Sequence, residues 1–81
     1  MSASDRLDAI DLPPLIRRAV DQHRARIERA QELAQLALAQ ERAEGFVEGV
    51  DVADALSPAT VETLSISLDD TVTARREILE A

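Results

Sequence analysis

The sequence of 81 residues has no cysteine, tryptophan, tyrosine or lysine, and it has a single histidine, His23, and a single phenylalanine, Phe46. Without cysteine the chain cannot form disulfide bonds or use a thiolate nucleophile, and one histidine does not suffice for the common zinc sites. Pockets for small molecules have apolar and aromatic walls, which this composition scarcely supplies. We therefore expect a protein that is not an enzyme, with no catalytic residue, no cofactor, no bound metal and no small-molecule substrate.

Long hydrophobic runs are also missing, because nowhere do about 18 apolar residues follow one another. The first residues, MSASDRLDAIDLPP, lack the basic start, the apolar stretch and the cleavage site of a signal peptide. This pattern predicts a cytoplasmic protein without a membrane partner. The net charge is −7, and residues 45–81 carry eight acidic residues against two arginines. Because such a surface repels a phosphate backbone, we expect no nucleic-acid partner.

What the chain does contain is a long stretch of helix-forming residues. From Leu15 to Glu44 there is neither glycine nor proline. The segment DLPP, residues 11–14, is typical of a helix start, since proline is tolerated in the first turn and an acidic residue favours the positive end of the helix dipole. These signals predict one helix within residues 13–45, about 45 Å long if it is continuous.

The apolar residues of this stretch recur at alternating steps of four and three, the spacing of one helix face. The members of this seam are Ile16, Val20, His23, Ile27, Ala30, Ala34 and Ala37, and Leu33, Leu36 and Leu38 widen it near its end. Arg24 is expected on the solvent side, where loss of a charge changes stability little. A helix this long cannot cover its own stripe. The rest of the chain, a second copy or a foreign protein must do so.

The second half of the sequence predicts shorter elements. Gly45 is expected to end the long helix, because glycine reaches the left-handed conformation of a helix C-terminus without a Cβ penalty. Ser57 followed by proline repeats a helix-start signal. Residues 63–68 alternate in a way that also suits a strand, but we favour helix, because residues 67–70 match a Ser-x-x-Asp form of the capping box and would open a further helix.

The expected fold class is therefore all-α, with one long N-terminal helix followed by two or three short helices. Residues 1–12 are polar and loosely patterned, and we expect a flexible N-terminus there. Residues 13–81 are expected to form a single small helical domain.

One short segment resembles a known family. The segment ALAQERAEG, residues 37–45, is similar to the inhibitory helix of VbhA-like antitoxins, whose motif is Ser or Thr, three residues, Glu, then Gly or Asn. Glu44 and Gly45 match the end of that motif, whereas Gln40 stands at the Ser/Thr position. The segment ISLDD, residues 66–70, looks like the start of the last short helix in that family.

The resemblance implies a small helical protein that binds and silences a Fic-domain toxin, an enzyme that transfers AMP from ATP to a protein hydroxyl. The inhibitory glutamate of the family pairs with an arginine that otherwise grips the γ-phosphate of ATP. Carboxylate and phosphate both accept bidentate bonds from a guanidinium, so such competition is chemically sound. Glu44 would be the blocking carboxylate. The plainer interpretation is that Glu44 and Gly45 only form a solvated helix end.

We thus expect the long helix to bind a protein partner or a second copy of the chain. The candidate partner-binding residues are Ile27, Leu33, Leu36, Arg42, Glu44, Gly45 and Phe46. The alternative function is a small self-associating structural or adaptor subunit of a larger assembly. A ribbon-type DNA-binding dimer, with TLSISL as the paired strand, would need a basic charge that the chain lacks.

Overall fold

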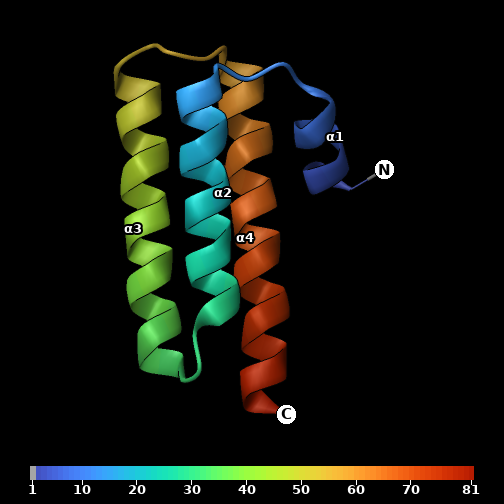
Figure 1. Ribbon diagram of the computed structural model, residues 1–81, viewed down its shortest axis with the longest axis vertical. Coiled ribbons are helices and arrows are strands. Elements are labelled where there is room, and N and C mark those ends of the chain that lie inside the picture. Colours follow the sequence, from blue (N-terminus) through green and yellow to red (C-terminus); the bar gives the residue numbers. More distant parts are fainter. Residues whose placement is uncertain (1) are drawn as a thin grey trace.

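The computed structural model describes residues 2–81 and is all helical over that range, with no strand. Its helices are α1 (Ala3–Ala9), α2 (Pro14–Arg29), α3 (Leu33–Val52) and α4 (Pro58–Glu80). Figure 1 shows α2, α3 and α4 side by side in an up-and-down bundle, with α1 against one end of α4. The all-α expectation is confirmed. The long N-terminal helix is wrong, because the first helix is short and the longest is α4, with 23 residues.

The N-terminal segment is a helix where the sequence analysis expects irregular chain. Ser2 caps α1 by accepting a hydrogen bond from the Asp5 backbone N–H at 3.1 Å, and the Asp5 side chain accepts from the Ser2 N–H in return. This pair is a capping box, which stabilises a helix start by satisfying two free backbone donors. Leu7 is fully buried and belongs to the core. Helix α1 is therefore an integral part of the packed structure.

The stretch expected to be one helix is broken between Arg29 and Leu33. Ala30 has an extended backbone (φ −59°, ψ 129°), and so has Glu32 (φ −149°, ψ 161°). The Ala30 carbonyl lies between α2 and α3 and accepts a hydrogen bond of 2.7 Å from Nε of Arg75 on α4. No glycine or proline causes this break. The chain reverses because a single long helix would leave its apolar stripe in water, whereas two antiparallel helices bury it against α4.

The reversal changes which residues of α3 face the core. On α2 the predicted seam is confirmed in part, since Val20 and Ile27 are fully buried. On α3 the predicted members Ala34 and Ala37 are exposed. The residues of α3 that are buried instead are Leu36, Ala39, Ala43 and Val50. The first three belong to one core cluster with Leu64, Leu68 and Val72 of α4. Because of the break, α3 does not continue the helical repeat of α2. The spacing of the seam on α2 therefore does not predict which side of α3 is buried.

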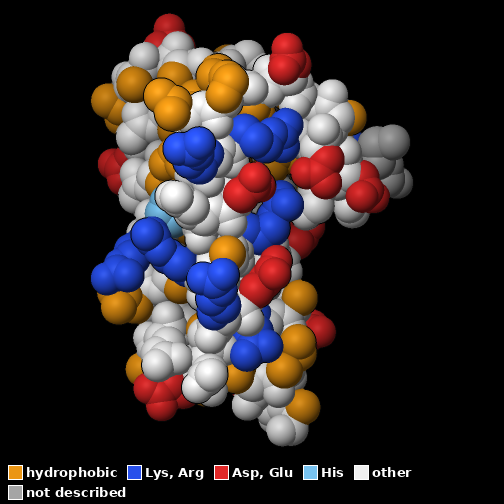
Figure 2. Space-filling view, in the orientation of Figure 1, with side chains coloured by type: hydrophobic (Ala, Val, Ile, Leu, Met, Phe, Trp, Pro, Cys, Tyr) orange, Lys and Arg blue, Asp and Glu red, His pale blue; other side chains and the backbone are white. Residues whose placement is uncertain are grey.

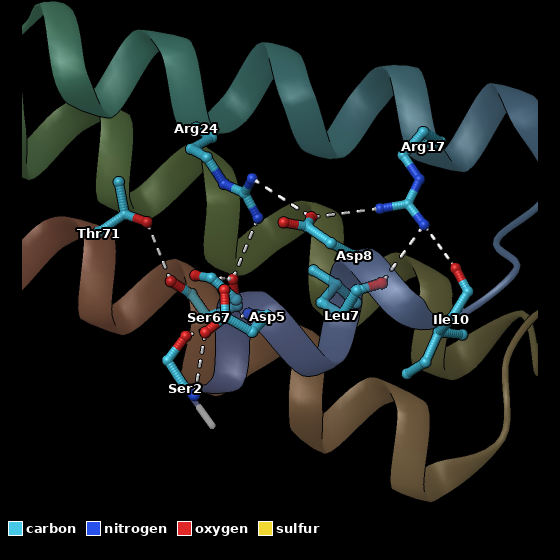
Figure 3. Close-up of polar contacts among 10 residues, drawn as sticks. Ser2, Asp5, Leu7, Asp8, Ile10, Arg17, Arg24, Ser67 and Thr71 are labelled. Carbon is cyan, nitrogen blue, oxygen red and sulfur yellow. Dashed lines mark hydrogen bonds and ion pairs between the residues drawn. The ribbon is translucent and has the colours of Figure 1, made fainter.

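A polar junction ties α1 to α2 and α4. Acidic and arginine side chains alternate along the border of α1 and α2 on the face in Figure 2, and Figure 3 shows the contacts beneath. Arg24 donates to Oγ of the buried Ser67 at 3.2 Å, and the hydroxyls of Ser67 and Ser4 share a hydrogen bond of 2.9 Å. Asp8 lies 3.7 Å from Arg17 and 3.9 Å from Arg24. The expectation that Arg24 is a free surface charge is therefore wrong.

Helix α4 is one continuous helix from Pro58 to Glu80. Ser57 caps it by accepting a hydrogen bond from the Thr60 N–H at 3.2 Å, which confirms the predicted start. Residues 63–68 are helical, as favoured above. No new helix begins at Ser67, because that residue lies inside α4 and its hydroxyl is used in the polar junction.

Helix α3 does not end at Gly45, as the sequence analysis expects, but runs on to Val52. Its end is formed without glycine, since Asp54 takes the left-handed conformation with φ 55°. The Asp54 N–H donates to the Asp51 carbonyl at 3.0 Å, and the Ala55 N–H donates to the Val50 carbonyl at 3.2 Å. These two bonds are the pattern of a Schellman motif. Aspartate is one of the few residue types that tolerate the conformation, although glycine adopts it without strain.

Replacing Asp54 with glycine is expected to raise the free energy of unfolding by about 0.5–1 kcal/mol, because the left-handed conformation no longer opposes a Cβ atom. Urea denaturation of the two proteins measures the difference. The matched control is Ala53→Gly at the neighbouring right-handed position (φ −73°, ψ −6°). It should lower the free energy by a similar amount. An Asp54→Gly protein less stable than the wild type would contradict the assignment.

Candidate functional site

A groove of about 260 Å³ lies between α3 and α4. Apolar side chains form much of its lining, namely those of Ala43, Val47, Leu68 and Val72. Four carboxylates line it as well, those of Glu44, Glu48, Asp51 and Asp69. We call this feature the acidic groove. An apolar lining with charge of one sign suits a guest that is itself amphipathic.

The helical repeat explains how these residues come together. On α3, Gln40, Glu44, Val47 and Asp51 recur at steps of four, three and four, so they share the flank of the helix next to α4. On α4, Leu68, Asp69 and Val72 are three, four and seven residues after Ser65, so these four also share one side of their helix. Both sets of residues lie next to the buried faces of their helices. The groove therefore adjoins the core.

The groove keeps a negative charge that the chain itself does not neutralise. Both ion pairs found among residues 2–81 involve Asp8, and neither includes a carboxylate of the groove. At one end Arg76 donates to the side-chain amide oxygen of Gln40, at 3.3 Å, and not to an acid. A positively charged guest would therefore meet four unpaired carboxylates within one binding surface.

Two of the predicted partner-binding residues are unavailable to a partner. Ile27 is fully buried and Leu36 is 1% exposed, and both belong to the core. They pack inside the bundle, where they hold α2 and α3 together, and do not contact an outside protein. Leu33 is 49% exposed at the start of α3.

The structure places Glu44 and Arg42 on different sides of α3. Glu44 is exposed and lines the acidic groove, whereas Arg42 lies beside Arg26 and Arg29 of α2 in a second hollow. We call the three arginines of this hollow the arginine cluster. Gly45 is exposed in the middle of α3. Since α3 continues to Val52, Glu44 lies in the middle of a helix and not at the helix end that Gly45 was expected to form.

The other residues of the groove are not among those predicted from the sequence to bind a partner. Val47, Glu48 and Asp51 follow Gly45, where the helix was expected to have stopped. Asp69 was assigned to a helix start. The four-three-four spacing from Gln40 to Asp51 is typical of one helix face. It indicates these residues only when the helix is taken to continue beyond Gly45 and Gly49.

Phe46 is half-buried and connects α3 to α2. Its ring stacks on that of His23, with 4.9 Å between the centroids and 29° between the planes. Nδ1 of His23 is buried and has no hydrogen-bond partner among residues 2–81. Burial, together with the nearby charge of Arg26, lowers the pKa of His23 below its ordinary value of 6.5. A proton on Nδ1 would have no hydrogen-bond acceptor among residues 2–81.

Stability should therefore fall as the pH drops below about 6.5, because the unfolded chain binds the histidine proton more readily than the folded one. The measurement is the free energy of unfolding at about pH 7.5 and about pH 5.5. His23→Phe keeps a stacked ring that does not titrate, and it is expected to show a smaller loss over this interval. Equal losses in both proteins would assign the pH dependence to the carboxylates that they share.

No protein-family model, curated protein sequence or solved structure matches this chain. Within residues 2–81, no helix combines the length and the apolar character needed to cross a membrane. The likeness around Glu44 and Gly45 is thus a resemblance of one short segment.

Proposed function

We propose that this protein is a helical protein-binding module without enzymatic activity, and that its acidic groove binds a basic amphipathic helix of a partner protein. The observation that carries the proposal is the set of four unpaired carboxylates around apolar side chains in the groove between α3 and α4. An apolar helix face can lie in such a groove while arginine or lysine beside it meets the acids.

The shape of the groove supports a helix as the guest. The groove runs between two antiparallel helices, so a third helix can pack along it as in a bundle. Val47 and Leu68 are members of its apolar lining, and they would take the guest's apolar side chains. Arginine suits the acids best, since its planar guanidinium donates two parallel hydrogen bonds to one carboxylate.

Charge should govern rate and specificity more than total affinity. An exposed ion pair contributes only about 0.2–1 kcal/mol, and salt screens it. Complementary charge nevertheless speeds encounter and excludes partners of the wrong sign. Binding through this groove is therefore expected to weaken strongly as the salt concentration rises.

A helical peptide with leucines along one face and arginines beside them serves as the probe. The probe is expected to shift the amide NMR signals of residues 40–51 and 65–72, whereas the same peptide with glutamate in place of arginine should not. Asp69→Arg should weaken binding about five- to tenfold, because it places a like charge against the peptide.

The matched control is Asp70→Arg, which makes the same change of charge one residue further along α4. Asp70 lies outside the acidic groove, in a hollow with Ser4 and Glu28. Its substitution should alter binding by less than about twofold. Equal effects of the two substitutions would show that only net charge attracts the peptide, and the groove would lose its assigned role.

A narrower form of the proposal is that the partner is a Fic-type AMP-transferase and that the protein is its antitoxin. Its support is the resemblance at Glu44 and Gly45, together with the position of Glu44, exposed at the acidic groove without an ion-pair partner among residues 2–81. A carboxylate held in this way could take the arginine that would otherwise bind the γ-phosphate of ATP. The blocking group would act from the middle of α3 and not from a helix end.

Replacing Glu44 with glutamine tests this narrower form. The variant should still bind the AMP-transferase, because it keeps the shape of the groove, but AMP transfer in the mixture should rise at least about tenfold, since an amide holds a guanidinium more weakly than a carboxylate. The assay is labelled-AMP transfer after co-purification with a Fic-domain enzyme. Glu41→Gln, one turn earlier and outside the groove, is the control. A wild-type chain that leaves transfer unchanged would exclude the antitoxin function.

The second candidate function is a small self-associating structural or adaptor subunit of a larger assembly. The observation that favours it is that Leu38 and Val52 of α3 are exposed and lie outside the acidic groove. Self-association can be tested separately from partner binding, by measuring the oligomeric state of the chain alone.

A further inference from the structure

The hollow between α2 and α3 that holds the arginine cluster has polar side chains of one kind. Its volume is about 270 Å³, and its charged side chains are Arg26, Arg29 and Arg42, with no carboxylate in its lining. Gln35 also lines it, and the side-chain oxygen of Gln35 accepts a hydrogen bond from the Gln31 N–H at 2.9 Å. The NH₂ group of that amide is thus left as a donor. Three positive charges and a further donor suit a negatively charged ligand.

The arginine cluster keeps its charge within the fold. Figure 2 shows arginine side chains grouped over α2 and its border with α3. The arginine side chains that form ion pairs or hydrogen bonds within residues 2–81 are those of Arg17, Arg24, Arg75 and Arg76, and none of them belongs to the cluster. Burial, as the larger cause, and then the charge of Arg26 lower the pKa of His23. The charge of Arg26 therefore acts on its surroundings without a counter-ion from the chain.

The stability of the fold accounts for two of the three arginines. Arg26 and Arg29 lie in the last turn of α2, where a positive charge favours the negative end of the helix dipole. Arg42 lies in the middle of α3, where the dipole offers no such gain and the two neighbouring arginines repel it. The chain has 16 acidic residues against nine arginines, yet it places no acid in this hollow. An anionic ligand from outside the chain explains the position of Arg42.

The number of charges in the cluster indicates which anion fits. A carboxylate has one negative charge and two oxygens, and a single arginine can pair with both oxygens. A phosphate monoester has about two negative charges near neutral pH and three strong acceptor oxygens. Three guanidinium groups therefore match a phosphate monoester better than they match a carboxylate.

The surroundings of the cluster indicate what carries the phosphate. All three arginines are exposed, so a free phosphate ion would remain largely in water, and a larger ligand gains from further contacts. Leu38 lines the same hollow and is 48% exposed, which offers an apolar contact beside the charges. A nucleic-acid strand has a phosphate at every nucleotide and would extend past the hollow. The net charge of −7 opposes that, so a single phosphate on a protein segment fits better.

We propose that the arginine cluster binds a phosphorylated side chain of a partner protein. Arg26, Arg29 and Arg42 donate to the phosphate oxygens, and Leu38 contacts an apolar side chain next to the phosphorylated residue. Grouped arginines are a recurring means by which proteins recognise phosphorylated peptides.

This site goes beyond the proposed binding of a basic helix and does not depend on it. The hollow of the arginine cluster and the acidic groove lie on different sides of α3 and have no lining residue in common. Asp69→Arg, which should weaken binding of the basic peptide, is expected to change binding of a phosphopeptide by less than about twofold. Failure of one proposal is therefore distinguishable from failure of the other.

A short peptide with one phosphoserine and a leucine beside it serves as the probe, and isothermal titration calorimetry at low salt measures its binding. The phosphopeptide is expected to bind at least about tenfold more tightly than the same peptide with glutamate in place of phosphoserine, because glutamate has one charge and two oxygens. Inorganic phosphate and a short single-stranded oligonucleotide are measured in parallel. Both should bind more weakly than the phosphopeptide.

Substitutions in the cluster assign the binding to these residues. Arg29→Gln and Arg42→Gln should each weaken binding of the phosphopeptide about tenfold, because each removes a charge and a pair of donors. Arg6→Gln makes the same change at an exposed arginine of α1 outside the hollow, and it should alter binding by less than about twofold. Arg42→Gln should unfold at the same or a higher urea concentration than the wild type, because it relieves repulsion. Weaker binding would then not reflect a damaged fold.

His23 reports on the same site in the unaltered chain, as its only histidine. An anion held at Arg26 offsets the charge that lowers the pKa of His23, so the phosphopeptide should raise this pKa. NMR titration of the imidazole signals measures the change. The unphosphorylated peptide should leave the pKa where it is.

Selective binding of the phosphopeptide, weakened by both cluster variants and kept by Arg6→Gln, supports the proposal. No binding up to about 1 mM peptide overturns it, as does equal binding of the glutamate peptide. Inorganic phosphate or the oligonucleotide binding as tightly as the phosphopeptide would also overturn it, since the site would then serve a small anion or a nucleic acid.

Discussion

The reversal of the chain at Ala30 is the feature on which the rest of the structure depends. It converts an unbroken run of helix-forming residues into two antiparallel helices, each able to bury its apolar side against α4. The carbonyl freed at this point is not left without a partner, because Arg75 donates to it across the bundle at 2.7 Å. A buried carbonyl without a partner costs about as much as a lost hydrogen bond. Breaking this helix is therefore tolerable only once α4 is in place.

The reversal also determines which sides of α3 are buried and which are exposed. With the phase reset, one side of α3 is buried, one flank borders α4 in the acidic groove, and the other flank carries Arg42 beside the arginines of α2. Opposite charges thus lie on the two flanks of a single helix. The proposed binding of a basic helix uses the flank that borders α4.

Polar contacts have a larger part in this small protein than its composition suggests. The buried Ser67 lies where α1, α2 and α4 meet, and its hydroxyl contacts both Ser4 and Arg24. Arg17 donates to the carbonyls of Leu7 and Ile10 and so holds the end of α1 to α2. A chain of 81 residues with one phenylalanine has few large side chains to bury. Hydrogen bonds that link three helices supplement that limited core and give α1 a defined position.

The sequence by itself determined the helical class, the starts of α2 and α4, and the buried side of α2, because caps, prolines and local periodicity act within a few residues. Only the tertiary structure decided where the long run breaks and where α3 ends. No glycine or proline marks Ala30, and the partner of its carbonyl lies 45 residues away on α4. The glycines at 45 and 49 do not stop the helix, since packing of Ala43, Phe46 and Val50 offsets their weak helix propensity. The acidic groove could not be predicted from spacing alone, because four of its ten lining residues belong to α4 and because the break determines which side of α3 faces that helix.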